Sequence, residues 1–423
     1  MVQKKDHGLA RFWPFSSPAP VAGWRYPAMR YPTLVSLILP LAAACVAAAP
    51  PRLETVDLFH AGQGGYAYYR IPGLVVTAKG TVLAYCEARR EGQNDWENID
   101  VLLRRSTDGG RTWEAPRVMG AIPGPHPQNP VALAGKYARA DQVTYSNPVA
   151  IATRDGTVHF FFCLEFNRCF YRRSDDDGAT FSPPEEITSD FQAFRPDYDW
   201  HIIAAGPGHG IELHSGRLVL PFWMSTGVGK NGFNPSAVGV IVSDDQGRSW
   251  RAAGIPFAAA TAGTNPTCGE VVELSQDRVM MNARSSSPSG HRLIVIGGQG
   301  GTQWGRPYFD PALVEQGCMG GITRLSEGRA GGKDRILFSN PDDPRARANL
   351  SIKLSYDEGA TWPVKRQLEP GPSSYSDLAV LPDGTILCLY ERGVVAPTSH
   401  QPTFLSVARF NLEWLTDGRD RLP

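Results

Sequence analysis

An eight-residue pattern, S-x-D-x-G-x-[TS]-[WF], constrains the fold of this chain more than any other feature. Its four copies begin at Ser106, Ser174, Ser243 and Ser355. The starts are 68, 69 and 112 residues apart, and the last interval is two units of 56. Midway through it, residues 297–304 keep the glycine and the tryptophan in register as a degenerate fifth copy. A unit repeated every 55–70 residues predicts a repeat architecture.

Each copy has the composition of a structural turn. Asp and Ser side chains can bond the backbone of their own turn, and glycine supplies a positive φ. The closing aromatic residue can fill the gap between neighbouring sheets. We therefore favour a structural role for these boxes over the alternative, that each one binds a sugar.

Alternating, β-branched segments precede the boxes and read as β-hairpins with Gly or Asp at the turn. The expected hairpins are Leu74–Cys86, Val149–Leu164, Ile211–Phe222, Val271–Met281, Ile322–Arg324 paired with Arg335–Phe338, and Leu378–Tyr390. Residues 53–415 divide into six units of about 60 residues, which predicts an all-β, six-bladed β-propeller of four-stranded antiparallel sheets. Thr55–Phe59 and Phe404–Phe410 remain as the end strands that would close the ring.

The first 49 residues read differently from the rest. Leu34–Ala49 is apolar, follows Arg25 and Arg30, and ends in a run of small residues that suits signal-peptide cleavage. It is short for a bilayer span, which needs about 20 residues. We expect residues 1–49 to be an export signal with a polar lead, Met29 being an alternative start, and the mature chain to be periplasmic or extracellular. A retained anchor is the alternative.

Charge and cysteine content exclude several functions. The chain has 42 Lys+Arg and 42 Asp+Glu, whereas nucleic-acid and membrane-surface proteins need a basic excess. No CxxC pair occurs among Cys86, Cys163, Cys169, Cys268, Cys318 and Cys388, so we expect no metal site. Buried free thiols are expected, with one disulfide as an alternative in an oxidising compartment.

The boxes, together with later motifs in a fixed order, resemble the sialidase (neuraminidase) family. The motifs are Tyr69-Arg70-Ile71-Pro72, Gly206–Ile211, Asn282-Ala283-Arg284, Arg347-x-Asn349-Leu350, Tyr375-Ser376-Asp377-Leu378 and Leu389-Tyr390-Glu391. The resemblance covers about 360 residues, essentially the whole mature chain. It implies an exo-α-sialidase without a cofactor that acts on sialylated glycans: glycoproteins, gangliosides and oligosaccharides.

The resemblance implies that Arg70, Arg284 and Arg347 hold the carboxylate of sialic acid, with Arg345 as a competitor for the third role. Charge-assisted hydrogen bonds from three guanidinium groups suit that anion, at about 1.5–3 kcal/mol each. Arg89 matches a further substrate contact. Glu87 and Glu391 match the acids that hold the first arginine of the triad in position.

The same resemblance makes Tyr375 the nucleophile and Asp95 the acid/base. A neutral phenol avoids the repulsion that a carboxylate would meet beside the substrate carboxylate. Its ordinary pKa is about 10, so it needs a base. Asp95 lies on a polar loop beside Trp96, where covering by the substrate would raise the pKa of a carboxyl group.

The base is where the sequence departs from the family. Cys268 stands at the expected glutamate position, and Glu270 follows two residues later, about 6.5 Å along a strand. Either a β-bulge brings Glu270 back to Tyr375 or the usual Tyr–Glu pair is missing; we favour Glu270.

Two rivals to a retaining exo-α-sialidase stay open. One is a non-catalytic carbohydrate-binding propeller, which Cys268 favours. The other is an enzyme of the same fold with a transferase outcome or a related nonulosonic acid as substrate. Fold alone does not decide between them.

Overall fold

The computed structural model describes residues 17, 19, 23, 50–92, 94–258, 264–328, 332–396 and 401–422. The predicted export signal therefore lies almost wholly outside the described residues and stays a prediction. No helix among the described residues is long and apolar enough to cross a membrane.

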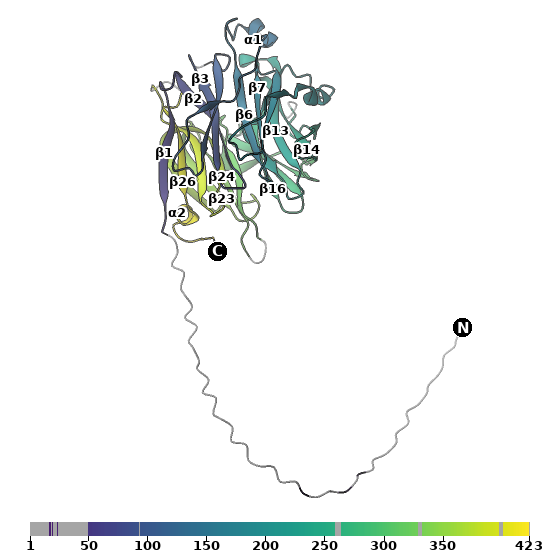
Figure 1. Ribbon diagram of the computed structural model, residues 1–423, viewed down its shortest axis with the longest axis vertical. Helices are drawn as coiled ribbons and strands as arrows, with labels where there is room; N and C mark the ends of the chain where they lie inside the picture. The colour runs from purple at the N-terminus through teal and green to yellow at the C-terminus, as the bar shows by residue number, and fades with distance from the viewer. Residues whose placement is uncertain are drawn as a thin grey trace, which may run out of the picture. The chain divides into compact units, whose positions relative to one another are not determined.

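The chain is all-β, with small antiparallel sheets in a β-propeller arrangement (Figure 1). The first sheet contains β2 (Tyr68–Val76), β3 (Val82–Arg89), β4 (Ile99–Ser106) and β5 (Arg117–Val118). The second contains β6 (Tyr145–Ala152), β7 (Val158–Leu164), β8 (Arg168–Ser174) and β9 (Glu185–Glu186), with β11 (Gly208–His209) added parallel to β6.

Two further sheets have five strands each. One contains β10 (Ile202–Ala205), β12 (Ile211–Glu212), β13 (Leu218–Val228), β14 (Asn234–Ser243) and β15 (Arg251–Ala252). The other contains β16 (Thr267–Leu274), β17 (Arg278–Arg284), β18 (His291–Gly298), β19 (Gln303–Trp304) and β20 (Tyr308–Val314).

The last sheet has seven strands in the order β1-β26-β25-β24-β23-β22-β21. They are β1 (Leu53–His60), β21 (Gly321–Ser326), β22 (Arg335–Pro341), β23 (Ala348–Ser355), β24 (Val364–Val380), β25 (Ile386–Arg392) and β26 (Phe404–Phe410). The first and last strands, β1 and β26, pair with Leu53 opposite Phe410, which is the closure expected from the sequence. Figure 1 shows these strands, purple and yellow, side by side.

The prediction of a six-bladed propeller, with one four-stranded sheet in each blade, was wrong. The described strands form five hydrogen-bonded sheets, and only one of them is four-stranded. The physical reason is β24, which has 17 residues. Its first part pairs with β23 and its second part, from Ser373, pairs with β25, so one continuous strand joins hydrogen-bonding partners on both sides.

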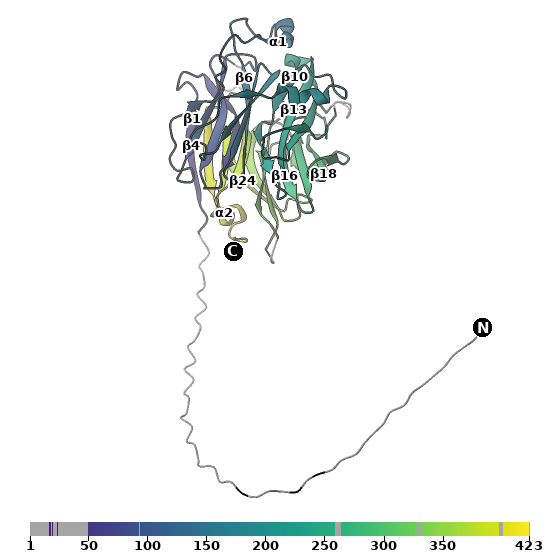
Figure 2. The same ribbon diagram turned by 45° about the vertical axis from the view of Figure 1, so that its right-hand side comes forward.

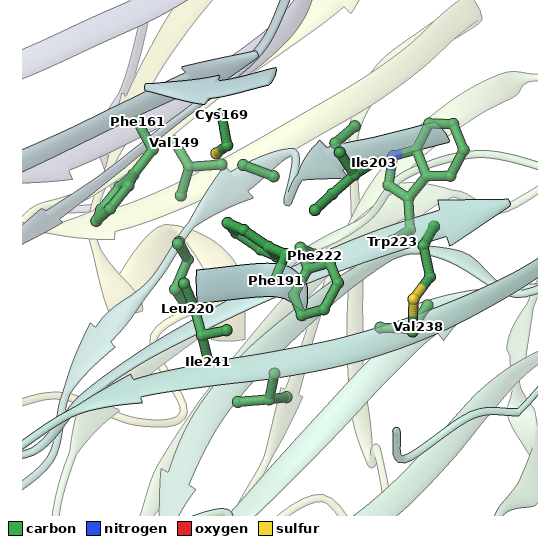
Figure 3. Packing of buried hydrophobic residues seen from close by; sticks show 14 of the residues in the cluster. Val149, Phe161, Cys169, Phe191, Ile203, Leu220, Phe222, Trp223, Val238 and Ile241 are labelled. Carbon is green, nitrogen blue, oxygen red and sulfur yellow. The ribbon is translucent and has the colours of Figure 1, made fainter. Parts of the chain in front are cut away.

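Helical structure is sparse: α1 (Pro130–Gly135), α2 (Leu412–Thr416) and the 3₁₀ segments Thr188–Phe194 and Lys230–Gly232. In both views α1 and α2 lie at opposite ends of the strands (Figure 1 and Figure 2). The largest buried cluster packs the faces of neighbouring sheets together, with Phe161, Phe191, Phe222 and Trp223 among its aromatic members (Figure 3).

The repeated boxes are structural turns, as predicted. In the third copy the Ser243 hydroxyl donates to Asp245 at 2.8 Å, and Asp245 accepts the backbone N–H of Ser249 at 2.9 Å. The box glycines have φ between +74° and +82°. The ring of Trp250 lies 5.1 Å from that of Phe161 on the neighbouring sheet, so the aromatic residue does fill the gap between sheets. All six cysteines among the described residues are buried and free.

Candidate active site

Tyr375 lies on β24 with its side chain among three arginines: Arg70 on β2, Arg284 on β17 and Arg347, which directly precedes β23. Arg284, the last residue of β17, donates a hydrogen bond from Nη1 to the phenol oxygen at 2.8 Å. The guanidinium carbons of Arg70 and Arg347 lie 5.0 and 5.4 Å from the centre of the ring. The fold thus brings together three cations that are far apart in the sequence.

Burial raises the pKa of Tyr375 to about 12, although the three neighbouring arginines oppose the rise. The phenol is therefore protonated at neutral pH, and any role for it as a nucleophile requires a group that takes its proton.

Glu391 connects the first arginine to Tyr375. Its Oε1 accepts hydrogen bonds from Nε of Arg70 at 3.2 Å and from the backbone N–H of Ile71 at 3.0 Å. Its Oε2 accepts from the backbone N–H of Tyr375 at 3.3 Å. Arg70 keeps a buried Nη2 that has no hydrogen-bond partner among the described residues. This donor is available to an anion in the site.

Glu87 holds Arg89, not Arg70 as the resemblance implied. Its Oε2 accepts from Nε and Nη2 of Arg89 at 3.1 and 2.7 Å, and its Oε1 accepts from the backbone N–H of Asn147 at 2.9 Å. Glu87 and Arg89 are two residues apart on β3, so both side chains lie on the same face. Arg70 lies opposite Glu87 on β2, but its Nε donates to Glu391 instead. The two groups are 1% and 2% exposed, which fixes Arg89 rigidly.

Asp95 lies on the loop between β3 and β4 and is one-third exposed. Its Oδ1 accepts a hydrogen bond from Nη1 of Arg89 at 2.8 Å. Burial acts to raise the pKa of Asp95, but the charges of Arg89 and Arg70 outweigh it and hold the pKa below its ordinary value. The unliganded site thus keeps Asp95 ionised.

A β-bulge recurs where strands reach this site. Pairing registers shift at Ile71 on β2, at Asn147 on β6 and at Cys268 on β16, and each of these residues has a positive φ of 48° to 58°. Positive φ is strained for such side chains, and bulges re-aim side chains next to functional sites. All three residues line the same cavity.

The bulge on β16 directs Cys268, not Glu270, to the phenol. The Sγ of Cys268 lies 3.9 Å from the hydroxyl oxygen of Tyr375. Glu270 is fully buried, and its Oε2 accepts the backbone N–H of Ile322 at 2.9 Å. A Cβ on Gly208 would lie 1.8 Å from the other oxygen, so the carboxyl group is packed against that glycine. The structure therefore does not bring Glu270 to Tyr375.

Glu270 belongs instead to a buried group with His209 and Asp377, whose ligand-type atoms all lie within 4.8 Å of one another. His209 Nδ1 and Asp377 Oδ1 are 2.8 Å apart. This group is the arrangement among the described residues whose atoms could hold a metal ion. Burial and the nearby Asp377 raise the pKa of Glu270 well above its ordinary value.

The site opens into a cleft with an inner and an outer part. The inner cavity of about 340 Å³ is lined by Tyr375, Cys268, Arg284 and Arg89. Its lining also includes an aromatic wall, in which Phe233 packs against Phe166 and Trp223. The outer cavity of about 460 Å³ is lined by Arg70, Arg345, Arg347, Gln316 and others. Asp95 and Lys230 line both, so the two parts are continuous.

Sequence reasoning missed the aromatic wall, Lys230 and Gln316. The wall residues read as ordinary strand or loop hydrophobics, and only their common position at the cleft distinguishes them. Lys230 lies on a 3₁₀ segment that approaches Trp96, whose indole N–H donates to the carbonyl of Asn231 at 3.0 Å. That loop contact carries no pattern in the sequence.

Comparison with known proteins agrees with this geometry. Residues 128–388 match the model of the BNR repeat-like domain family. A sialidase of Micromonospora viridifaciens is 33% identical over 406 residues, which cover 89% of this chain and 57% of that protein. The chain therefore spans little more than half the length of this relative.

Solved structures point to the same family. A Hadza microbial sialidase superposes with a TM-score of 0.69 at 26% identity, covering 86% of this chain and 69% of the other. An intramolecular trans-sialidase from Ruminococcus gnavus shares the fold, with a TM-score of 0.68 at 20% identity over 85% of this chain and 98% of the other. On the family match, the sequence relative and the shared fold, the chain belongs to the sialidase family with BNR repeats.

Proposed function

We propose that the protein is an exo-α-sialidase that removes terminal α-linked sialic acid from glycoproteins, gangliosides or oligosaccharides by a retaining mechanism. One observation carries the proposal: a buried phenol, that of Tyr375, lies among three guanidinium groups in a cleft that also contains Asp95.

The arginines account for the substrate. Sialic acid carries a carboxylate on its anomeric carbon, and three guanidinium groups would hold that carboxylate beside the phenol. The unpartnered Nη2 of Arg70 supplies one of the donors. Because hydrogen bonds to charged groups contribute about 1.5–3 kcal/mol each, the cluster favours a substrate whose anion adjoins the reacting carbon.

Tyr375 is the nucleophile of the proposal. Its oxygen attacks the anomeric carbon, the bond from that carbon to the leaving oxygen breaks, and Asp95 gives its proton to the leaving oxygen. In the second step Asp95 takes a proton from water, the water oxygen attacks the anomeric carbon, and the phenol oxygen leaves. Two displacements at one carbon retain the configuration.

Asp95 can act as the acid only if its pKa rises when the substrate binds. Arg89 and Arg70 keep it ionised in the free site. A bound carboxylate brings a negative charge to Arg70 and offsets the effect of Arg70 on Asp95, while the aglycone excludes water from Asp95. Both changes raise a carboxyl pKa.

Cys268 is the group placed to take the phenol proton, since its Sγ is the sulfur 3.9 Å from the hydroxyl oxygen. In its thiolate form Cys268 would take the phenol proton as the phenol oxygen attacks and return it as that oxygen leaves, so the proton balance of the two steps closes. The presence of Cys268 where the family has a glutamate also favours a second candidate function. That candidate is a sialic-acid-binding propeller that has kept its arginines and lost turnover.

The test is incubation of the full chain with 3′-sialyllactose, monitored by proton NMR. The proposal expects free α-anomeric sialic acid as the first product. β-Anomeric sialic acid would overturn the retaining mechanism, whereas an anhydro or sialyl-transferred product would indicate a transferase. Binding without any product would support the binding propeller.

We further propose that the mature chain is exported. The support is the apolar stretch Leu34–Ala49 with its small-residue end. Expression in a bacterial host, followed by N-terminal sequencing of the periplasmic fraction, tests this. A chain that begins near residue 50 is expected, and an uncleaved cytoplasmic chain would contradict it.

A further inference from the structure

The outer part of the cleft carries more positive charge than one carboxylate needs. Its lining includes the cations Arg70, Lys230, Arg345 and Arg347, against the single acid Asp95. The whole chain, in contrast, is balanced at 42 basic and 42 acidic residues. The excess is therefore local to this cavity.

Two of these cations are unpaired. The side chains of Arg345 and Lys230 are exposed, and neither has an ion pair or hydrogen bond among the described residues. Arg70 is paired with Glu391, and Nη2 of Arg347 donates to the carbonyl of Gly317. Arg345 and Lys230 are thus free to bind an anion from the solvent side.

Gln316 adds an independent sign that something polar binds here. Its Oε1 and Nε2 are both buried, and neither has a hydrogen-bond partner among the described residues. An unsatisfied buried amide costs free energy unless a ligand or water completes it. Gln316 lines the same cavity as Arg345, so a polar ligand in that cavity would meet both.

The position of Asp95 indicates which part of a substrate reaches this cavity. Asp95 gives its proton to the leaving oxygen in the proposed reaction, so the leaving group must lie beside it. Asp95 and Lys230 line both parts of the cleft. The sugar that leaves is therefore in reach of Lys230 and Arg345.

We propose that Arg345 and Lys230 form a subsite for a second anionic group, carried by the leaving sugar. The preferred substrates are then sialosides whose penultimate residue is itself negatively charged. The anion is a carboxylate if that residue is another sialic acid, or a sulfate ester if it is a sulfated sugar. This inference rests on the proposed sialidase function.

The test compares kcat/KM of the full chain on three substrates: 3′-sialyllactose, its α2,8-linked disialyl form and a 6-sulfated form. We expect about a tenfold preference for at least one charged form at low salt. The preference should shrink in 0.5 M NaCl, because exposed charges are screened. The two charged substrates distinguish a carboxylate from a sulfate as the anion.

Variants locate the effect. Arg345→Gln and Lys230→Gln should each lower kcat/KM for the preferred charged substrate several-fold while changing that for 3′-sialyllactose less than twofold. Arg306→Gln, at an exposed arginine outside the cleft, is the matched control and should change neither. Equal turnover of all three substrates, or equal losses on charged and uncharged leaving groups, would overturn the subsite.

Failure of the proposed sialidase function can be distinguished from failure of the subsite, because only the former abolishes turnover of every substrate. If no substrate is turned over, calorimetric binding of the same three glycans decides the subsite: tighter binding of a charged form, lost in Arg345→Gln, supports it. Equal binding of all three overturns it.

Discussion

The Sγ of Cys268 lies 3.9 Å from the phenol oxygen of Tyr375, while the carboxyl group of Glu270 is turned to the backbone N–H of Ile322. A thiol therefore stands beside the proposed nucleophile where the sequence led us to expect a carboxylate. This difference determines which residues control proton transfer in the site.

Replacement of Cys268 tests its part in proton transfer. We expect Cys268→Ala to lower kcat about 100-fold with little change in KM, since a general base contributes about 10²–10⁴-fold. Cys268→Glu should restore turnover and extend it to lower pH, because a carboxylate is ionised above about pH 4. Steady-state pH profiles measure both effects. Cys169→Ala, at a buried cysteine in a core cluster that does not contain Tyr375, is the control. Full kcat in Cys268→Ala would contradict this role.

The charge of Arg89 should set the alkaline limit of activity. Because Arg89 helps to hold the pKa of Asp95 down, Arg89→Gln raises that pKa. The acid is active when protonated, so the alkaline limb of kcat/KM for sialyllactose should move to higher pH. Arg90→Gln, at a surface arginine paired with Asp100, should leave the limb in place. If the alkaline limb of the kcat/KM profile stays in place or moves to lower pH in Arg89→Gln, Asp95 is not the acid.

Loss of the carboxylate of Glu391 should lower the free energy of unfolding. Glu391→Gln weakens the pair with Arg70 and replaces an acceptor with an N–H₂ group facing backbone donors. We expect a loss of about 3 kcal/mol in the free energy of unfolding, as for other broken buried pairs. Urea unfolding measures it. Glu114→Gln, which breaks the surface pair with Arg105, should cost less than 1 kcal/mol. Similar effects of the two substitutions would be inconsistent with the role given to Glu391.

The box aspartates should contribute to stability at neutral pH but not in acid. Hydrogen bonds from the side chain and backbone of Ser249 lower the pKa of Asp245 to about 2. A depressed folded-state pKa gives stability that is present above the unfolded value of about 4 and is lost as pH falls towards 2. Asp245→Asn should therefore lower the free energy of unfolding at pH 7. The difference in unfolding free energy between this variant and the unmodified chain should become smaller below pH 4. Asp197→Asn, at an exposed loop, should show no such trend. A pH-independent deficit in Asp245→Asn would refute the linkage.

Glu270 should tolerate neutralisation. Burial and Asp377 raise its pKa well above the ordinary value, which favours the protonated carboxyl group. Glu270→Gln is then close to isosteric and isoelectric. We expect kcat within threefold of the unmodified chain and an unfolding free energy within about 1 kcal/mol. A 100-fold loss of kcat with KM unchanged would return the role of base to Glu270.

The sequence predicted the parts of the fold that depend on local chemistry. The box residues bond within their own turns, so Asp245 and Ser249 could be read as a turn without knowledge of the rest. Closure by β1 and β26 was expected because these two end segments remained after the six hairpins had been assigned, and the structure pairs them. The number of separate sheets did not follow, because it depends on whether the backbone of β24 stays extended past Pro372.

The sequence predicted those site residues whose role depends on their position along a strand. It did not predict the residue whose role depends on a β-bulge. Arg70 and Arg284 reach Tyr375 from regular strand positions that the motifs indicate. Cys268 reaches it because its φ of 48° rotates the thiol inward, and no residue type in that segment requires such a turn. Glu87 accepts from Arg89, two residues along its own strand, although Arg70 lies directly opposite it on β2, so strand register alone did not identify its partner.

The most direct test of the central claim is turnover of 4-methylumbelliferyl α-sialoside by the full chain beside Tyr375→Phe. We expect the unmodified chain to release 4-methylumbelliferone and Tyr375→Phe to lose at least about 1,000-fold in kcat, with its circular dichroism spectrum and its binding of sialic acid retained. Equal turnover by the two proteins, or none by the unmodified chain, would contradict a sialidase that uses Tyr375 as its nucleophile.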